Sequence, residues 1–246
     1  MRLVDIPLRK INIELAEINA TKDKFFSIIS HDLRSPLSGL MQVLLIIVED
    51  YDSLENDEKQ QMITDVANTS KRTYDVMENL LEWSSVQTGN IPFYPQEIAL
   101  LELLTNLEAL YNQNLKSKGI TLKLNVKTEI SVYADKKMTE TILRNLISNA
   151  IKFTHPNGTI SVSSETDNDF VDTKVIDTGV GIKTKKLSEL FQVDKVQSTL
   201  GTIKETGTGL GLILCKELVE KQNGKMWVES KENEGTTFSF TLPSEK

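Results

Sequence analysis

The sequence is poor in cysteine, and its basic residues are neither clustered nor in excess over its acidic residues. It contains a single cysteine, Cys215, which excludes an internal disulfide framework and indicates a reducing compartment. The net charge is −7 and no cluster of lysine and arginine stands out, so neither nucleic acid nor an anionic membrane is an expected partner. The longest apolar run, residues 43–48, is too short to span a bilayer. We therefore expect a soluble segment without membrane contact, located in the cytoplasm by itself or as the cytoplasmic part of a larger or membrane-anchored receptor.

Glycine and proline are also scarce before residue 89, which indicates long helices in the first part of the chain. The first helix carries apolar residues at the alternating spacings of three and four that are typical of a coiled coil: Leu8, Ile11, Leu15 and Ile18. A parallel partner helix would cover this narrow stripe. One helix of a monomeric bundle would show the same pattern, but nothing else nearby would bury the stripe, so we favour a dimer.

A turn is expected near Asn56, where Ser53 or Asn56 could cap a second helix that ends at Gly89-Asn90. Residues 1–90 are therefore predicted to form an all-α antiparallel helical hairpin. Two copies of such a hairpin would form a dimeric four-helix bundle.

Residues 95–246 have a mixed pattern, after a linker marked by Pro92 and Pro95. The expected helices are 100–118, 138–153 and 210–222, and the expected strands are 120–126, 159–164, 170–176, 225–230 and 236–242. Helices layered on a mostly antiparallel sheet would make an α+β sandwich, so the chain is predicted to be multidomain.

One histidine lies on the polar side of a helix. When residues 25–40 are wound at about 100° per residue, the apolar side chains share one side and His31 falls nearly opposite. The carboxylate of Asp32 can hold the imidazole Nδ1–H, which leaves Nε2 free as a nucleophile. Pro36 removes a backbone donor and bends the helix at a cost of about 3 kcal/mol. This combination favours catalytic roles for His31 and Asp32 over a surface histidine without a task.

A polar stripe is expected on the helix over residues 138–153. Asn145, Asn149 and Lys152 share one face by the i, i+4, i+7 rule, and apolar residues take the other side. An amide oxygen is a hard ligand that suits Mg²⁺, which binds few protein groups together with phosphate oxygens and water. A nearby lysine supplies positive charge to such phosphates. An ordinary solvated helix face is the alternative interpretation.

Two glycine-rich segments suit a nucleotide. A strand ends in Asp177-Thr-Gly179-Val-Gly181, where the carboxylate can accept a hydrogen bond from an exocyclic amine such as that of adenine. The two glycines let the backbone approach a flat ring, although an ordinary Asp-Thr-Gly turn would look the same.

The second segment, residues 207–211, opens a helix with Gly207-Thr208-Gly209-Leu210-Gly211. Free amides and the positive end of the helix dipole favour phosphate at such a position. A dinucleotide-binding G-x-G-x-x-G after a strand and a G-x-x-x-x-G-K-[ST] loop are both absent from the sequence.

In this order, the segments resemble the sensor histidine kinases of two-component signalling over essentially the whole chain. FFSIISHDLRSPLSGL resembles the H box of that family, NLISNAIKFT the N box and DTGVGI the first glycine box. LFQVDK stands where the F box is expected, GTGLGL resembles the second glycine box, and GTTFSFTLP the closing strand motif. The resemblance implies a dimerisation and histidine-phosphotransfer domain over residues 1–90 and a catalytic ATP-binding domain of the gyrase and chaperone type over residues 95–246.

Carried across by position, the resemblance makes His31 the phosphoacceptor and Asp32 its assisting carboxylate. It places Asn149 on Mg²⁺, Asp177 on the adenine amine and Gly181 beneath the ring. The other nucleotide-binding residues that it implies are Asn145, Lys152, Phe153, Gly179, Gly207, Thr208, Gly209, Leu210 and Gly211.

The implied function is that of an ATP-dependent protein-histidine kinase with ATP and Mg²⁺ as its cofactors. As a homodimer it would phosphorylate His31 and pass the phosphoryl group to an aspartate on the receiver domain of a response regulator. Two other functions stay open on the sequence alone. One is a non-catalytic signalling scaffold that binds nucleotide as a conformational signal, and the other is a chaperone-like ATPase with the same nucleotide fold.

Overall fold

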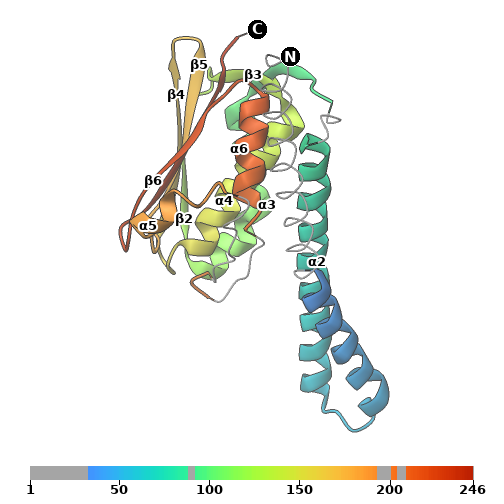
Figure 1. The fold of residues 1–246 in the computed structure, drawn as a ribbon. Coiled ribbons are helices and arrows are strands. Elements are labelled where there is room, and N and C mark those ends of the chain that lie inside the picture. The colour runs from blue at the N-terminus through green and yellow to red at the C-terminus, as the bar shows by residue number, and fades with distance from the viewer. Residues whose placement is uncertain (1–32, 88–91, 193–200, 204–208, 246) are drawn as a thin grey trace, which may run out of the picture. The chain divides into compact units, whose positions relative to one another are not determined.

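The computed structural model describes residues 33–87, 92–192, 201–203 and 209–245 (Figure 1). The chain divides into two compact units, Met1–Ser84 and Ser85–Lys246. The domain limits expected from the sequence, 1–90 and 95–246, stay predictions, because residues 88–91 lie outside the described part. The apolar stripe on residues 8–18 lies outside it as well. Among the described residues, no helix is long and apolar enough to cross a membrane.

The N-terminal unit is a helical hairpin, as predicted. Residues 33–50 are helical, and the helix includes Pro36. A turn leads to α2 (Asn56–Gln87), which runs antiparallel to the first helix (Figure 1).

The predicted cap of α2 is wrong. The Ser53 hydroxyl donates to the Asp50 carbonyl oxygen at 2.8 Å and so closes the preceding helix, while Asn56 is already the first helical residue of α2. The cap comes from Glu58, whose Oε2 accepts from the Glu55 backbone N–H at 3.0 Å. This is the carboxylate half of a capping box, which forms although the residue at the N-cap is neither serine nor threonine.

The C-terminal unit is a two-layer α+β domain, also as predicted. Its main sheet has five strands: β2 (Thr121–Asn125), β4 (Thr159–Asp167), β5 (Phe170–Asp177), β6 (Met226–Lys231) and β7 (Gly235–Pro243). The strand order is β2-β4-β5-β7-β6, and every neighbouring pair is antiparallel except β2 with β4. The helices α3 (Leu100–Lys118), α4 (Lys136–Phe153) and α6 (Gly211–Lys221) lie on one face of this sheet (Figure 1).

The core of this unit lies between the sheet and the helices α4 and α6. Its fully buried side chains include Ile160 and Val162 of β4, Phe240 and Leu242 of β7, Leu143, Leu146 and Ile147 of α4, and Leu214 of α6. Burying each such side chain is worth about 1.5–3 kcal/mol, so α4 is held firmly by its apolar side.

Two short strands and one short helix were not predicted. The strands β1 (Pro95–Ala99) and β3 (Ser131–Asp135) pair in a separate antiparallel sheet, and α5 (Thr184–Leu187) is a single turn. Pro95, predicted to lie in the linker, is the first residue of β1. β1 buries only Ile98, so it lacks the apolar alternation from which a strand is predicted.

Candidate functional site

The helix α4 presents the polar stripe expected from the sequence. Leu146, Ile147 and Ala150 are buried, whereas Asn145 and Asn149 are only partly buried. The Asn145 Nδ2 donates to the Thr141 carbonyl oxygen at 2.9 Å. By contrast, the side-chain amide of Asn149 has no hydrogen-bond partner among the residues that the structure describes. A half-buried amide without a protein partner is available to a ligand.

The Asp177 carboxylate lies at the end of β5 and is only 5% exposed. Its Oδ1 accepts a hydrogen bond from the Gly179 backbone N–H at 2.8 Å. Burial raises the pKa of Asp177 to about 6, and hydrogen bonds from the backbone of Gly179 and Thr236 oppose that rise in part. A further donor from a ligand, such as an exocyclic amine, would stabilise the ionised form.

The turn after β5 packs directly on the end of α4. A Cβ at Gly179 would lie 2.2 Å from the Phe153 carbonyl oxygen, and the Val180 N–H donates to that same oxygen at 3.1 Å. Gly181 has a φ of +64°, and a Cβ there would lie 2.0 Å from the Lys231 carbonyl oxygen. Both glycines are therefore required by close backbone packing, and the predicted approach of Gly181 to a flat ring stays a prediction.

The start of α6 meets the other end of the polar stripe. A Cβ at Gly211 would lie 2.6 Å from the Asn145 Oδ1, so only glycine fits there without a shift. Leu210 precedes the helix and is buried, and it supplies no side-chain cap. Gly209 has a φ of +75°, which glycine adopts without strain.

Two family models match the chain. The His Kinase A (phospho-acceptor) domain matches residues 21–89, and the Histidine kinase-, DNA gyrase B-, and HSP90-like ATPase matches residues 134–246. The catalytic domain of the histidine kinase ThkA, solved free of nucleotide, is 30% identical with a TM-score of 0.54, and the match covers 63% of this chain and 97% of that one. The chain belongs to the histidine kinases.

The chain spans only part of the length of the curated relatives that it matches. The uncharacterized sensor-like histidine kinase R01002 of Rhizobium meliloti (strain 1021) is 31% identical over 229 residues, which are 92% of this chain but only 44% of the relative. The adaptive-response sensory kinase SasA of Crocosphaera subtropica is 33% identical over 256 residues, 99% of this chain and 65% of the relative. The structure of ThkA in complex with the response regulator protein TrrA shares the fold, with a TM-score of 0.72 at 21% identity over 100% of this chain and 68% of that one.

The family and the ATPase-type fold predicted from the motifs are thus confirmed. Of the predicted site residues, the structure gathers Asn145, Asn149, Lys152 and Phe153 on α4, with Asp177, Gly179, Gly181 and Gly209, Leu210 and Gly211 on the segments around it. The predicted residues His31, Asp32, Gly207 and Thr208 lie outside the described part of the chain.

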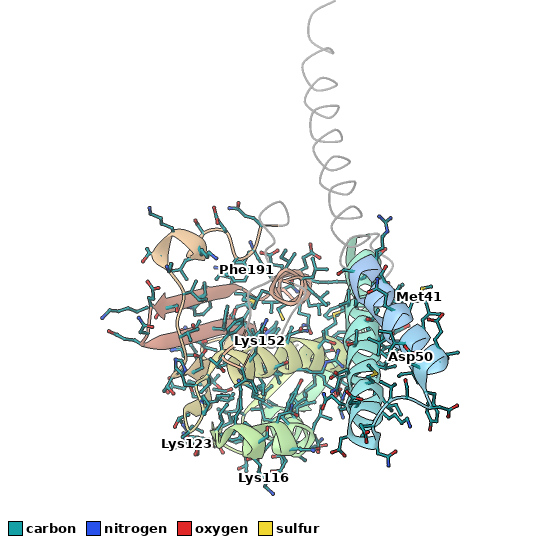
Figure 2. The ribbon with its side chains drawn as sticks, turned by 90° about the horizontal axis from the view of Figure 1, so that it is seen from below. Met41, Asp50, Lys116, Lys123, Lys152 and Phe191 are labelled. Carbon is teal, nitrogen blue, oxygen red and sulfur yellow. The ribbon has the colours of Figure 1, made fainter. Side chains whose placement is uncertain are left out.

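Two aromatic rings of the histidine kinase motifs have a lysine above them. The Lys152 Nζ lies 4.6 Å from the centroid of the Phe153 ring. Phe191, in the segment that resembles the F box, has the Lys216 Nζ of α6 at 5.6 Å from its centroid. Figure 2 shows Lys152 on α4 and Phe191 beside α6. The cation of Lys152 is therefore held at the end of the polar stripe, where phosphate charge is expected.

The described residues contain no group of three or more histidine, cysteine, aspartate or glutamate side chains that could hold a metal ion. Mg²⁺ usually keeps several waters and takes substrate phosphate oxygens, so it needs only one or two protein ligands. The Asn149 amide oxygen, which has no hydrogen-bond partner among the described residues, is of the ligand type that Mg²⁺ accepts, and its predicted role as a magnesium ligand stays a prediction.

Sequence reasoning missed two residues at the C-terminal end of α4. Lys118 and Thr202 both hydrogen-bond to the last turn of that helix. Lys118 gave no distinctive signal, because a lysine in the last turn of a helix is usually a solvent-exposed cation. Thr202 has no signal, because it lies in a polar segment without periodicity.

Proposed function

We propose that this chain is the catalytic segment of an ATP-dependent protein-histidine kinase. It binds Mg-ATP within residues 95–246, transfers the γ-phosphoryl group to His31, and passes that group to an aspartate of a response regulator receiver domain. The observation that carries the proposal is the arrangement around α4. The Asn149 amide, without a hydrogen-bond partner in the described part of the chain, and the buried Asp177 carboxylate lie on elements that are joined by the close packing of Gly179 on Phe153.

Each end of the nucleotide has chemistry to match it. The Asp177 carboxylate accepts from the exocyclic amine of adenine, which repays part of the cost of burying its charge. Asn149 supplies an amide oxygen to Mg²⁺, which neutralises phosphate charge when it is bound. Lys152 adds a cation beside the phosphates, and the glycines of residues 207–211 offer backbone N–H groups at the start of α6.

The transfer itself needs a positioned nucleophile rather than covalent assistance from many residues. The His31 Nε2 lone pair attacks the γ-phosphorus, the bond to the β–γ bridging oxygen breaks, and ADP leaves with that electron pair. Asp32 orients the ring through the Nδ1–H and stabilises its positive charge. In the second step an aspartate oxygen of the receiver domain attacks the same phosphorus, and the N–P bond breaks.

The surface of the hairpin supports a homodimer. Several large apolar side chains on the described part of its two helices are exposed in the single chain, among them Met41 at 65%, Val48 at 77% and Leu81 at 55%. A second hairpin would cover them and complete the four-helix bundle. Light scattering of residues 1–90 at micromolar concentration should give the mass of a dimer, and a monomer mass would contradict this part of the proposal.

A response regulator is the proposed partner because the kinase ThkA, which shares the fold, has been solved in complex with the response regulator protein TrrA. We propose the cytoplasm as the location of this segment, where ATP and a receiver domain are available to it.

The decisive test is incubation with γ-labelled ATP and Mg²⁺, followed by acid and base treatment of the product. A phosphorylated histidine is a phosphoramidate, so the label should be lost in acid and kept in base. Steady ATP hydrolysis without labelled protein would favour a chaperone-like ATPase instead. Nucleotide binding with neither label nor hydrolysis would favour a signalling scaffold.

A further inference from the structure

Lys118, the last residue of α3, has a buried ammonium group beside the C-terminal end of α4. The residue is 5% exposed. Its Nζ donates to the Ile151 carbonyl oxygen at 2.7 Å, to the Lys152 carbonyl oxygen at 3.1 Å and to the Thr202 hydroxyl at 2.7 Å. The Thr154 carbonyl oxygen lies 3.5 Å from the same Nζ. Burying an ammonium is costly unless hydrogen bonds compensate it, so the folded chain holds this group and these oxygen atoms in one arrangement.

These contacts fix the last turn of α4 from outside the helix. Carbonyl groups at a helix C-terminus lack partners within the helix, and those of Ile151 and Lys152 receive the Lys118 ammonium instead. Thr202 binds the same turn, because its backbone N–H donates to the Lys152 carbonyl oxygen at 3.1 Å and its hydroxyl donates to the Thr154 carbonyl oxygen at 2.9 Å. Donors from α3 and from residue 202 therefore meet at the end of this helix.

The next carbonyl group of this turn, that of Phe153, holds the segment that follows β5. The Val180 N–H donates to the Phe153 carbonyl oxygen at 3.1 Å, and a Cβ at Gly179 would lie 2.2 Å from that oxygen. The same segment starts at Asp177, whose Oδ1 accepts from the Gly179 N–H at 2.8 Å. A tilt of the Phe153 carbonyl group must therefore displace Gly179, and the Asp177 carboxylate is bonded to Gly179.

Apolar packing alone does not set the direction of these carbonyl groups. Leu146 and Ile147 are fully buried, so the sheet holds the middle of α4, but apolar packing is not directional. A hydrogen bond weakens steeply as its angle narrows, so the donors at the last turn decide where the Phe153 carbonyl group points. Without the Lys118 ammonium, the carbonyl groups of this turn could tilt toward water, and the segment that holds Asp177 would move with them.

We propose that Lys118, held by Thr202, positions the Asp177 carboxylate for the exocyclic amine of adenine and so sets the preference of the site for that base. Lys118 is a positioning residue, because it acts through the last turn of α4 rather than on the nucleotide itself. The inference rests on the proposed function, which takes Asp177 as the acceptor for this amine. Loss of the ammonium should therefore weaken the recognition of the amine, which a loss of stability alone would not do.

The test compares ATP with purine riboside triphosphate, which is ATP without the exocyclic amine. Calorimetry of the full chain with Mg²⁺ should show that the parent prefers ATP by about tenfold to a hundredfold, the effect of one charge-assisted hydrogen bond. Lys118→Met keeps the length of the side chain and removes the ammonium. We expect this preference to fall about fivefold to tenfold, which is within the contribution of that hydrogen bond, while purine riboside triphosphate binds within about twofold of the parent.

Lys116→Met is the matched control for the loss of a lysine. Lys116 is exposed and lies in the same last turn of α3 (Figure 2). Because an exposed ammonium stays hydrated in the folded chain, its removal should leave the affinities for both nucleotides as in the parent.

A double-mutant cycle with Asp177→Asn tests whether Lys118 acts through the carboxylate. In the Asp177→Asn background the charge-assisted hydrogen bond to the amine is already lost. Lys118→Met should then change the preference for ATP by less than about twofold, because the two substitutions remove the same recognition.

Thr202→Val tests the arrangement without removing the buried charge. The variant keeps the shape of the side chain, but it neither accepts from the Lys118 ammonium nor donates to the Thr154 carbonyl oxygen. We expect the preference for ATP to fall about threefold, less than in Lys118→Met, because the carbonyl groups of α4 still bind the ammonium. Thr202→Ser keeps the hydroxyl and should restore the preference of the parent.

Three outcomes would overturn the positioning role of Lys118. The first is an unchanged preference for ATP in Lys118→Met, whether both nucleotides keep their affinity or lose it equally, which would make Lys118 a merely structural residue. The second is an unchanged preference in Thr202→Val, which decides the matter even if Lys118→Met fails to fold. The third is full additivity with Asp177→Asn. A parent chain that binds the two nucleotides equally would instead overturn the proposed role of Asp177, and that of Lys118 with it.

Discussion

The two units of the molecule treat their apolar side chains in opposite ways. In the described part of the helical hairpin, large apolar residues on both helices are exposed, including Met41, Leu45 and Ile63. In the C-terminal unit, the apolar sides of α4 and α6 are buried against the five-stranded sheet, with Leu146 and Leu214 at 0% exposure. The C-terminal unit therefore completes its own core, whereas the hairpin needs a further surface to cover it.

This difference indicates what positions the residues that bind nucleotide and what positions the hairpin that carries the phospho-acceptor. Asn149 and Asp177 lie at the rim of a completed core, so packing within one chain positions them. The hairpin matches the phospho-acceptor domain, and in the proposed homodimer a second hairpin would complete its packing. Nucleotide binding should therefore be separable from phosphorylation, and the predictions below test that separation.

The largest expected effect is the loss of phosphorylation in His31→Gln. Glutamine cannot act as the nucleophile, so labelled protein should be abolished, while calorimetry should show ATP affinity unchanged because the binding residues belong to the other unit. His155→Gln is the matched control, since His155 is exposed and is the only other histidine. Acid-labile label that persists in His31→Gln would place the phosphoacceptor elsewhere.

Asp32→Asn should produce a smaller effect on the same step. The amide keeps the size of the side chain but loses the charge that orients the imidazole and stabilises its cation. General-base contributions are about 10² to 10⁴ in rate, so single-turnover labelling should slow within that range while the dimer remains. A rate equal to that of the parent would mean that the pairing of Asp32 with His31 has no part in catalysis.

Asp177→Asn should have opposite effects on two properties of the C-terminal unit, its affinity for ATP and its stability without nucleotide. The variant replaces an acceptor-only carboxylate by an amide that both donates and accepts, so a charge-assisted hydrogen bond at the adenine edge is lost and ATP affinity should fall by about tenfold to a hundredfold. Stability without nucleotide should change in the opposite direction. Since the pKa of Asp177 is raised from 3.8 to about 6, the folded state binds this proton more tightly than the unfolded state.

The sign of the pH dependence follows from that raised pKa. The stability that Asp177 confers is full below pH 3.8 and is lost as the pH rises to about 6, by at most about 3 kcal/mol. At pH 7 the nucleotide-free variant should therefore unfold at a higher denaturant concentration than the parent, and at pH 4 the two should be alike. Equal stabilities at pH 7 would show that the buried carboxylate carries no such cost.

The periodicity of apolar residues predicted the helices and strands that bury one face regularly. It failed to predict a strand with almost no buried residues. The helices α3 and α4 and the strands β4 to β7 were found within a few residues of their limits, because each buries one side against a single layer. β1 was missed because Ile98 is its only buried residue, and its strand character depends on pairing with β3. Pairing between distant segments leaves no local trace in composition.

The candidate site shows the same limit. Asn145, Asn149 and Lys152 were found together because helical spacing alone puts them on one face. Lys118 lies 33 positions before its partner Ile151 in α4, and Thr202 lies 50 positions after its partner Lys152. The hydrogen bond between Lys118 and Thr202 joins residues 84 positions apart. Motifs reveal residues that share a local element, whereas hydrogen bonds between three distant segments become visible only in the fold.

The smallest expected effects compare helix caps in the two units. Asp135 is 6% exposed, its Oδ1 accepts from the backbone N–H groups of Lys137 and Met138 at the start of α4, and its Oδ2 accepts from that of Tyr94. Asp135→Ala should lower the free energy of unfolding of the C-terminal unit by about 2 kcal/mol, because the freed donors are shielded from water. Urea unfolding of residues 85–246 measures this loss.

Glu58→Ala removes the corresponding carboxylate from the hairpin, where Glu55 and Glu58 are exposed. Water replaces the lost acceptor there, so the free energy of unfolding of the hairpin should change by less than about 0.5 kcal/mol. A loss as large as that in Asp135→Ala would mean that the turn end of the hairpin is covered in the assembly. In that case the contrast between the exposed hairpin and the buried core of the C-terminal unit would hold only for the faces of the two hairpin helices, and not for the turn that joins them.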